Sequence, residues 1–161
     1  MTKITVLTHN DLQQQDLSLF VDIIYNNFIH LADFPKLLHT KNNIYELLRD
    51  ENAFVLLTFQ NQNECDKITS FVVGQKIELA DRRRVLFVNY IYVAEPMRQK
   101  GLGSELMDTV ETMAVNNKLN GVMLIYDTLN PKLSNFYQNR GYMSDLNLRR
   151  FEQHDVFYLP G

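Results

Sequence analysis

A short basic, glycine-rich stretch has the residue types and spacing to bind a charged ligand. It consists of Arg98-Gln99-Lys100-Gly101-Leu102-Gly103-Ser104, between a β-rich run and a helical pattern. A turn between a strand and a helix leaves unpaired amide N–H groups at the helix start, with the positive end of the helix dipole behind them. Such a turn suits a phosphate or pyrophosphate. Gly101 and Gly103 let the backbone approach ligand oxygens, while Arg98 and Lys100 add positive charge.

Other interpretations of this stretch fit the sequence less well. A helix entry that merely packs tightly is the structural alternative. A dinucleotide site of the nicotinamide type would use Asp127, which ends the next strand at about the ~20-residue distance expected of a ribose-binding acid. However, Leu106 occupies the third glycine position of that fingerprint, and too few residues follow Asp127 for the other half of that fold. A Walker P-loop lacks its G-x-x-x-x-G-K-[ST] pattern.

The first half of the chain predicts one strand, two helices and a meander of three strands. Residues 3–8 predict a short strand, and His9-Asn10-Asp11 predict a turn after it. Apolar residues recur at helical spacing from Leu17 to Leu31 and again from Leu37 to Leu48, with a break at residues 32–35. Three β-rich runs then predict an antiparallel meander. These runs are residues 54–59, 68–79 and 85–94.

The second half predicts a βαβ unit followed by a short helix and two strands. A helical pattern begins at Leu102, and the apolar run at residues 121–126 is expected to lie parallel to the strand before the turn. Pro131 favours the start of a helix that Gly141 ends. Residues 142–148 and 155–159 can form two further strands. The predicted class is therefore α/β (α+β), with a mixed sheet and helices on both faces.

The composition of the chain disfavours several classes of function. The chain has 161 residues and a net charge of -3, which favours one domain and disfavours a strongly basic nucleic-acid binder. The run Arg82-Arg83-Arg84 is expected to lie in a solvent-exposed turn. The single cysteine, Cys65, provides no disulfide framework, and the apolar runs are too short for a membrane span or an export signal. The four histidines show no metal-ligand spacing, so we expect no metal.

The second half resembles the GNAT superfamily of acyl-CoA-dependent N-acyltransferases. The family's pyrophosphate motif, [RQ]-x-x-G-x-[GA], is matched by Arg98, Gly101 and Gly103. Its later signature combines an Asn, a small residue, a Phe-Tyr pair and a Gly-aromatic pair. The matching residues are Asn130, Ser134, Phe136-Tyr137 and Gly141-Tyr142. The resemblance is strong over residues 85–142 and rests on pattern alone in the N-terminal half.

This resemblance implies a single N-acetyltransferase domain over residues 1–161, whose two central strands splay apart, with acetyl-CoA as the acyl donor. The coenzyme pyrophosphate would lie on the backbone of Gln99, Lys100, Gly101, Leu102, Gly103 and Ser104, with Arg98 near its start. Ile91 and Val93 would pair with the pantetheine arm through backbone groups, as an added strand does. Asn130 would touch the pantetheine or acyl region. Tyr137 would act as general acid near the sulfur, although an aromatic residue that fills the core is the alternative.

One residue departs from the family pattern. Many relatives carry a glutamate base where this chain has Asn89. An amide cannot accept a proton in the working pH range, although it can hold a water. Deprotonation of the amine then rests on water, on Asp127 or Glu78, or on the low pKa of the substrate itself. Surface solvation is the alternative role for both acids.

The acceptor is left open by the sequence. In this architecture the choice of acceptor depends on the connection at residues 28–40 and on the C-terminal strands. His30, Asp33 and Phe34 are the candidate residues in that connection. A small amine, a polyamine, a lysine side chain and a protein N-terminus all fit. We expect a cytoplasmic monomer or homodimer with neither nucleic-acid nor membrane partners. The alternative function is a coenzyme A-binding or interaction module with little catalytic activity.

Overall fold

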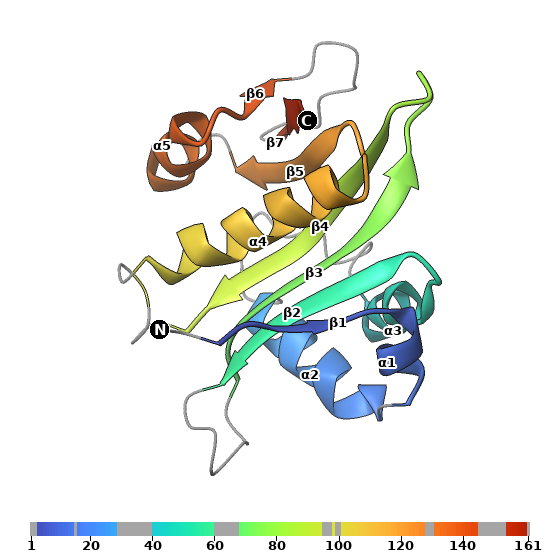
Figure 1. Cartoon of the computed structure of the whole chain (residues 1–161). Helices are drawn as coiled ribbons and strands as arrows, with labels where there is room; N and C mark the ends of the chain where they lie inside the picture. Colours follow the sequence, from blue (N-terminus) through green and yellow to red (C-terminus); the bar gives the residue numbers. More distant parts are fainter. Residues whose placement is uncertain are drawn as a thin grey trace. The chain divides into compact units, whose positions relative to one another are not determined.

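The structure is a computed structural model that describes residues 3–14, 16–28, 40–59, 68–94, 98, 101–127, 131–144 and 154–160. Its elements appear in Figure 1. They are β1 (Thr5–Leu7), α1 (His9–Gln13), α2 (Leu17–Phe28), α3 (Lys41–Arg49), β2 (Ala53–Phe59), β3 (Ile68–Glu78), β4 (Arg84–Val93), α4 (Leu102–Asn116), β5 (Gly121–Asp127), α5 (Pro131–Asn139), β6 (Met143–Ser144) and β7 (His154–Pro160). The chain forms two compact units. The first unit is Met1–Gln75 with Tyr90–Asp108, and the second unit is Lys76–Asn89 with Thr109–Gly161.

In the first unit, α1, α2 and α3 pack against the strands β1, β2 and β3. β1 pairs antiparallel with β2, and β2 pairs antiparallel with β3 from Ala53 opposite Gln75 to Thr58 opposite Ser70. An irregularity follows between Thr58 and Phe59. Residues of both layers form one apolar core, because the helices bury the stripe that their periodicity predicted. Its buried members are Leu12, Leu17, Val21, Ile24, Ile44, Leu48, Ala53, Val55, Leu57, Phe71, Val73 and Tyr90.

The prediction of a turn at His9-Asn10-Asp11 was wrong, because these residues begin the short helix α1. The Asp11 carboxylate accepts hydrogen bonds from the backbone N–H of Thr8 at 3.0 Å and from its hydroxyl at 3.2 Å. Leu12 then enters the core with 2% of its surface exposed. Thus polar residues that are typical of turns can also begin a helix when the following residue, here Leu12, is buried in the core.

The second unit contains the strand order β4-β5-β7-β6. β4 runs parallel to β5, with pairs from Val85 opposite Gly121 to Val88 opposite Leu124, as predicted. β7 lies antiparallel to both β5 and β6. This mixture of parallel and antiparallel strands, with α4 following β4 and α5 following β5 (Figure 1), confirms the predicted α/β class. The splay of β4 from β5 involves both units and stays a prediction.

Several predicted boundaries moved or lie outside the described residues. α2 is described to Phe28 and α3 from Lys41, so the predicted break at residues 32–35 is outside the description. β6 is described only over Met143–Ser144 of the predicted 142–148. In the arginine turn, Arg82 is exposed and Arg83 pairs with Asp81 at 2.7 Å, as expected of a solvated turn. Among the described residues, no helix has the length and apolar character needed to cross a membrane.

Candidate functional site

The glycine-rich stretch does join a strand to a helix, since β4 ends at Val93 and α4 begins at Leu102. Gly101 has φ +80°, and a Cβ added there would meet nothing within 4 Å. The glycine is therefore favoured by the backbone conformation and not by lack of space. The N–H of Glu105 donates to the carbonyl of Gly101 at 3.0 Å, which starts the helical hydrogen bonding of α4.

The start of α4 has the form of an anion site. The backbone N–H groups of Leu102, Gly103 and Ser104 fall in the first turn, where helix geometry supplies no acceptor within the helix. Leu102 is 3% exposed and anchors this turn in the interior, while Gly103 and Ser104 are half-buried. The predicted residues Gln99 and Lys100 lie outside the described part of the chain. The arrangement can hold an anionic group by backbone donors and the helix dipole.

Arg98 folds back onto the end of β4. Its Nε donates to the carbonyl oxygen of Val93 at 2.8 Å, and its side chain is exposed. This bond fixes the beginning of the turn against the strand that precedes it. The guanidinium has further N–H donors, so Arg98 can both brace the turn and offer positive charge to a ligand there.

The backbone orientation at the end of β4 suits the predicted pairing with an extended ligand. The N–H of Ala94 donates to the carbonyl of Thr69 on β3 at 2.8 Å. Backbone groups of successive strand residues point to opposite edges, so those of Val93 point away from β3, and those of Ile91 do so where the strand is regular. Both residues are half-buried. An extended chain that adds to this edge would find Ile91 and Val93 oriented toward it.

The second predicted motif forms a compact aromatic cluster in the second unit. Tyr137 on α5 is 4% exposed. Its ring meets those of Phe136 and Tyr142 edge-on, with centroids 4.9 Å and 5.7 Å away. Gly141 has φ +93° and ends the helix as predicted. The burial of Tyr137 fits both the predicted general acid and its packing alternative.

An ion-pair network that the sequence did not predict anchors α5 to α4 within the second unit. The Arg140 guanidinium donates to both oxygens of the Glu111 carboxylate, at 2.8 Å and 3.3 Å. The Tyr142 hydroxyl donates to the same carboxylate at 2.8 Å. Burial and the charge of Glu111 raise the pKa of Tyr142 above its ordinary value. We name Glu111, Arg140 and Tyr142 the α4–α5 clamp.

Of the remaining residues that the sequence predicted for the site, the structure describes some and leaves others out. Asn89 lies on β4, and its buried Oδ1 has no hydrogen-bond partner among the described residues. Glu78 is exposed at the end of β3. Asn130 and the predicted acceptor residues His30, Asp33 and Phe34 lie outside the description, as does the side chain of Asp127. The glycine-rich turn belongs to the first unit and Tyr137 to the second, so their meeting at one site stays a prediction.

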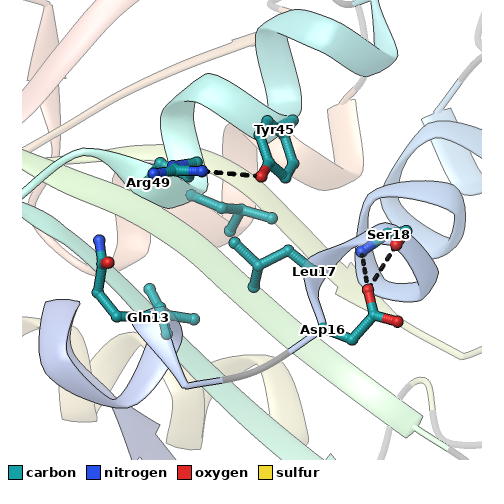
Figure 2. A pocket seen from close by; sticks show the side chains of 8 residues that line it. Gln13, Asp16, Leu17, Ser18, Tyr45 and Arg49 are labelled. Carbon is teal, nitrogen blue, oxygen red and sulfur yellow. Dashed lines mark hydrogen bonds between the residues drawn. The ribbon is translucent and has the colours of Figure 1, made fainter.

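A cavity of about 260 Å³ in the first unit was not anticipated from the sequence (Figure 2). Leucines of all three helices line it together with several polar side chains. The lining residues are Leu12, Gln13, Asp16, Leu17, Ser18, Tyr45, Leu48 and Arg49. The main polar groups already bond locally: Ser18 donates twice to Asp16, and Arg49 donates to the Tyr45 hydroxyl at 2.9 Å. The hydrogen bonds from Ser18 also lower the pKa of Asp16, which lies directly before α2 and accepts a backbone N–H of its first turn. We assign this cavity no part in the candidate site.

A glycine-rich turn that opens a helix after a parallel strand is the form of an α/β protein that binds an anionic ligand. The family model described as "Acetyltransferase (GNAT) family" matches residues 21–142. The chain therefore belongs to the GNAT acetyltransferase family. That match includes both motifs and extends into the N-terminal half, where the sequence had offered only a pattern.

Solved structures share this fold. Arabidopsis thaliana NAA60 in complex with acetyl-CoA is 10% identical with a TM-score of 0.69, over 99% of this chain and 98% of the other. The Escherichia coli ribosomal-protein-S18-alanine N-acetyltransferase is 16% identical with a TM-score of 0.67, over 99% and 94%. An aminoglycoside acetyltransferase from an uncultured soil metagenomic sample is 15% identical with a TM-score of 0.66, over 93% of each chain. At these identities the likeness establishes the fold alone.

Proposed function

We propose that this protein is an N-acetyltransferase that moves an acetyl group from acetyl-CoA to a primary amine, with residues 1–161 acting as one domain. The observation that carries the proposal is the turn at Gly101, whose positive φ leads directly into the first-turn amides of α4. Family membership supports it. So do the solved relatives, since one is in complex with acetyl-CoA and another, the NatC complex, is bound to CoA.

The donor would lie along the end of β4 and the start of α4. First-turn amides from Gly101 to Ser104, with Gln99 and Lys100 before them, would hold the pyrophosphate, and Arg98 would add charge. The outward backbone groups of Ile91 and Val93 would pair with the pantetheine arm. Asn130 would contact its far end. Most of these contacts would use backbone groups of β4 and α4, so the site would position the thioester with little rearrangement.

The reaction needs one bond formed and one broken at the thioester carbon. The neutral amine attacks that carbon, a C–N bond forms, and the tetrahedral intermediate expels the coenzyme thiolate as the C–S bond breaks. The net proton passes from nitrogen to sulfur. Tyr137 would donate a hydrogen bond to the departing sulfur. A phenol pKa of about 10 exceeds a thiol pKa of about 8.5, so hydrogen bonding contributes more than complete proton transfer.

The acceptor class is an amine of a small molecule or a protein. The related structures bear names that cover both kinds, an aminoglycoside acetyltransferase and a ribosomal-protein-alanine N-acetyltransferase. Coenzyme binding is tested first: acetyl-CoA and coenzyme A should raise the melting temperature, and no rise at concentrations well above micromolar would contradict the proposal.

Catalysis is tested by thiol release from acetyl-CoA across a panel of amines, with and without Tyr137→Phe. We expect this substitution to lower kcat about a hundredfold, the lower end for a positioned proton donor, with coenzyme affinity unchanged. Tyr45→Phe is the matched control, because Tyr45 lies on α3 and its hydroxyl accepts a bond only from Arg49 among the described side chains. Equal turnover in wild type and Tyr137→Phe would remove Tyr137 from the mechanism.

A second function is favoured by the amide of Asn89 at the position of the family's glutamate base. A coenzyme A-binding module would bind acetyl-CoA without transferring its acetyl group. Coenzyme-dependent stabilisation with no thiol release on any amine would support this second function over the first.

A further inference from the structure

Asn89 has a buried acceptor atom that the described protein leaves unpaired. Its Oδ1 has no hydrogen-bond partner in the described part of the chain. Most buried polar atoms in folded proteins are paired, because an unpaired acceptor loses its hydration without replacement. A buried carbonyl oxygen with no donor among the described residues therefore points to a donor brought by another molecule.

The place of Asn89 in the sheet favours a substrate as that molecule. Asn89 follows Val88, whose pairing with Leu124 lies at the carboxyl end of the parallel ladder between β4 and β5. In open α/β sheets, ligands bind outside the carboxyl ends of the parallel strands. The unpaired Asn89 oxygen thus lies where such a sheet binds its ligand. A ligand that pairs with this oxygen must donate an N–H or O–H to it.

The chemistry of this side chain restricts the substrate. A carboxamide oxygen accepts a hydrogen bond but takes no proton near neutral pH. The charged side chains described on the neighbouring stretches of β3 and β4 are Lys76, Glu78 and Arg84, and all three are exposed. Burial raises the pKa of Tyr90, the next residue on β4, so its phenol also stays neutral. None of these groups is a buried base beside Asn89.

We propose that Asn89 Oδ1 accepts a hydrogen bond from the attacking amine, and that this enzyme acetylates α-amino groups in preference to lysine ε-amino groups. The inference rests on the proposed acetyltransferase function. With no buried base among the described side chains of this stretch, the amine enters already neutral, so its own pKa sets the reactive fraction. At pH 7.5 about a third of an α-amine with a pKa of about 7.8 is neutral, against roughly 0.1% of a lysine amine with a pKa of about 10.4. The expected preference is roughly 250-fold.

The test compares two peptides of one sequence, one with a free N-terminus and no lysine, the other with a blocked N-terminus and a single lysine. Initial rates of acetyl transfer are measured from pH 6 to 9.5 with the wild-type enzyme. We expect kcat/KM to be about a hundredfold or more higher for the free N-terminus at pH 7.5. The rate should rise tenfold per pH unit up to the pKa of each acceptor, so the rising limb moves with the acceptor.

Variants separate the amide's role from the substrate's pKa. Asn89→Ala removes the acceptor oxygen and should lower kcat/KM for the free N-terminus at least fivefold, with acetyl-CoA binding unchanged. Asn89→Asp keeps an acceptor oxygen and should recover part of the rate. Asn42→Ala, at an exposed position on α3, is the matched control.

Equal rates on the two peptides, or a rising limb fixed at one pH for both acceptors, would overturn the inference, because either result requires a base on the protein. An unchanged rate in Asn89→Ala would overturn the assigned contact. Acetylation of neither peptide nor of any small amine would overturn the proposed function itself. The two failures are therefore distinct.

Discussion

The α4–α5 clamp should contribute measurable stability, and Tyr142→Phe tests it with the smallest possible change. The substitution removes one hydroxyl that donates to the Glu111 carboxylate at 2.8 Å and keeps a ring that is 2% exposed. Glu111 keeps its bonds from Arg140, so no charge is stranded. A hydrogen bond to a charged group contributes about 1.5–3 kcal/mol, and we expect a loss of about 2 kcal/mol in the free energy of unfolding.

Urea unfolding followed by circular dichroism at pH 7 measures this loss. For a chain of this length it should lower the melting temperature by about 4–8 °C. Tyr45→Phe is the control, since the bond from Arg49 to Tyr45 is exposed and its loss should cost under about 1 kcal/mol. A double-mutant cycle of Tyr142→Phe with Glu111→Gln should show non-additivity above about 0.5 kcal/mol. A loss below about 0.5 kcal/mol for Tyr142→Phe, or full additivity, would refute the clamp as a unit.

Further outcomes follow from other contacts. Gly101→Ala should destabilise by about 1–2 kcal/mol in urea unfolding, because a Cβ is disfavoured at φ +80° although no neighbour obstructs it; no loss would mean that the turn relaxes freely. Thr40→Ala removes the N-cap of α3, whose hydroxyl accepts from the Asn43 N–H at 3.1 Å, and should cost about 1 kcal/mol, while Thr40→Ser should cost little. Burial raises the pKa of Tyr90 and Tyr142 in the folded state, so the unfolded chain releases these protons first and stability should fall as pH rises above about 10. Tyr142→Phe should flatten that alkaline decline, and an unchanged slope in equilibrium unfolding would contradict the burial argument.

The sequence predicted the class of fold because its signals are local and periodic. Alternating and helical patterns of apolar residues depend only on which side chains must share a face, and Leu17 and Ile24 on α2 do enter one core. The turn at Gly101 was also predictable, since glycine is the residue that a positive φ favours most. The prediction at His9 failed because Asp and Asn favour helix starts as much as turns, and the choice depended on the burial of Leu12.

The unpredicted parts of the site depend on residues far apart in the chain. Glu111 and Arg140 are separated by 29 positions, and no sequence spacing predicts an ion pair between residues so far apart. The unpaired oxygen of Asn89 is likewise invisible in a sequence, because burial and the lack of a donor belong to the folded chain. Sequence patterns therefore predicted the glycine-rich turn between β4 and α4, whereas the anchoring of α5 and the candidate amine contact became visible only in the folded chain.

The chain's division into two units has a consequence for dissection experiments. The path passes between the units at three places, after Gln75, after Asn89 and after Asp108. These three places fall inside β3, β4 and α4, respectively. Neither unit is one contiguous segment, so neither can be expressed by itself as a truncation product. A split-protein complementation system cut between β3 and β4, at residues 79–83, would divide both units, so reassembly would report on both units at once.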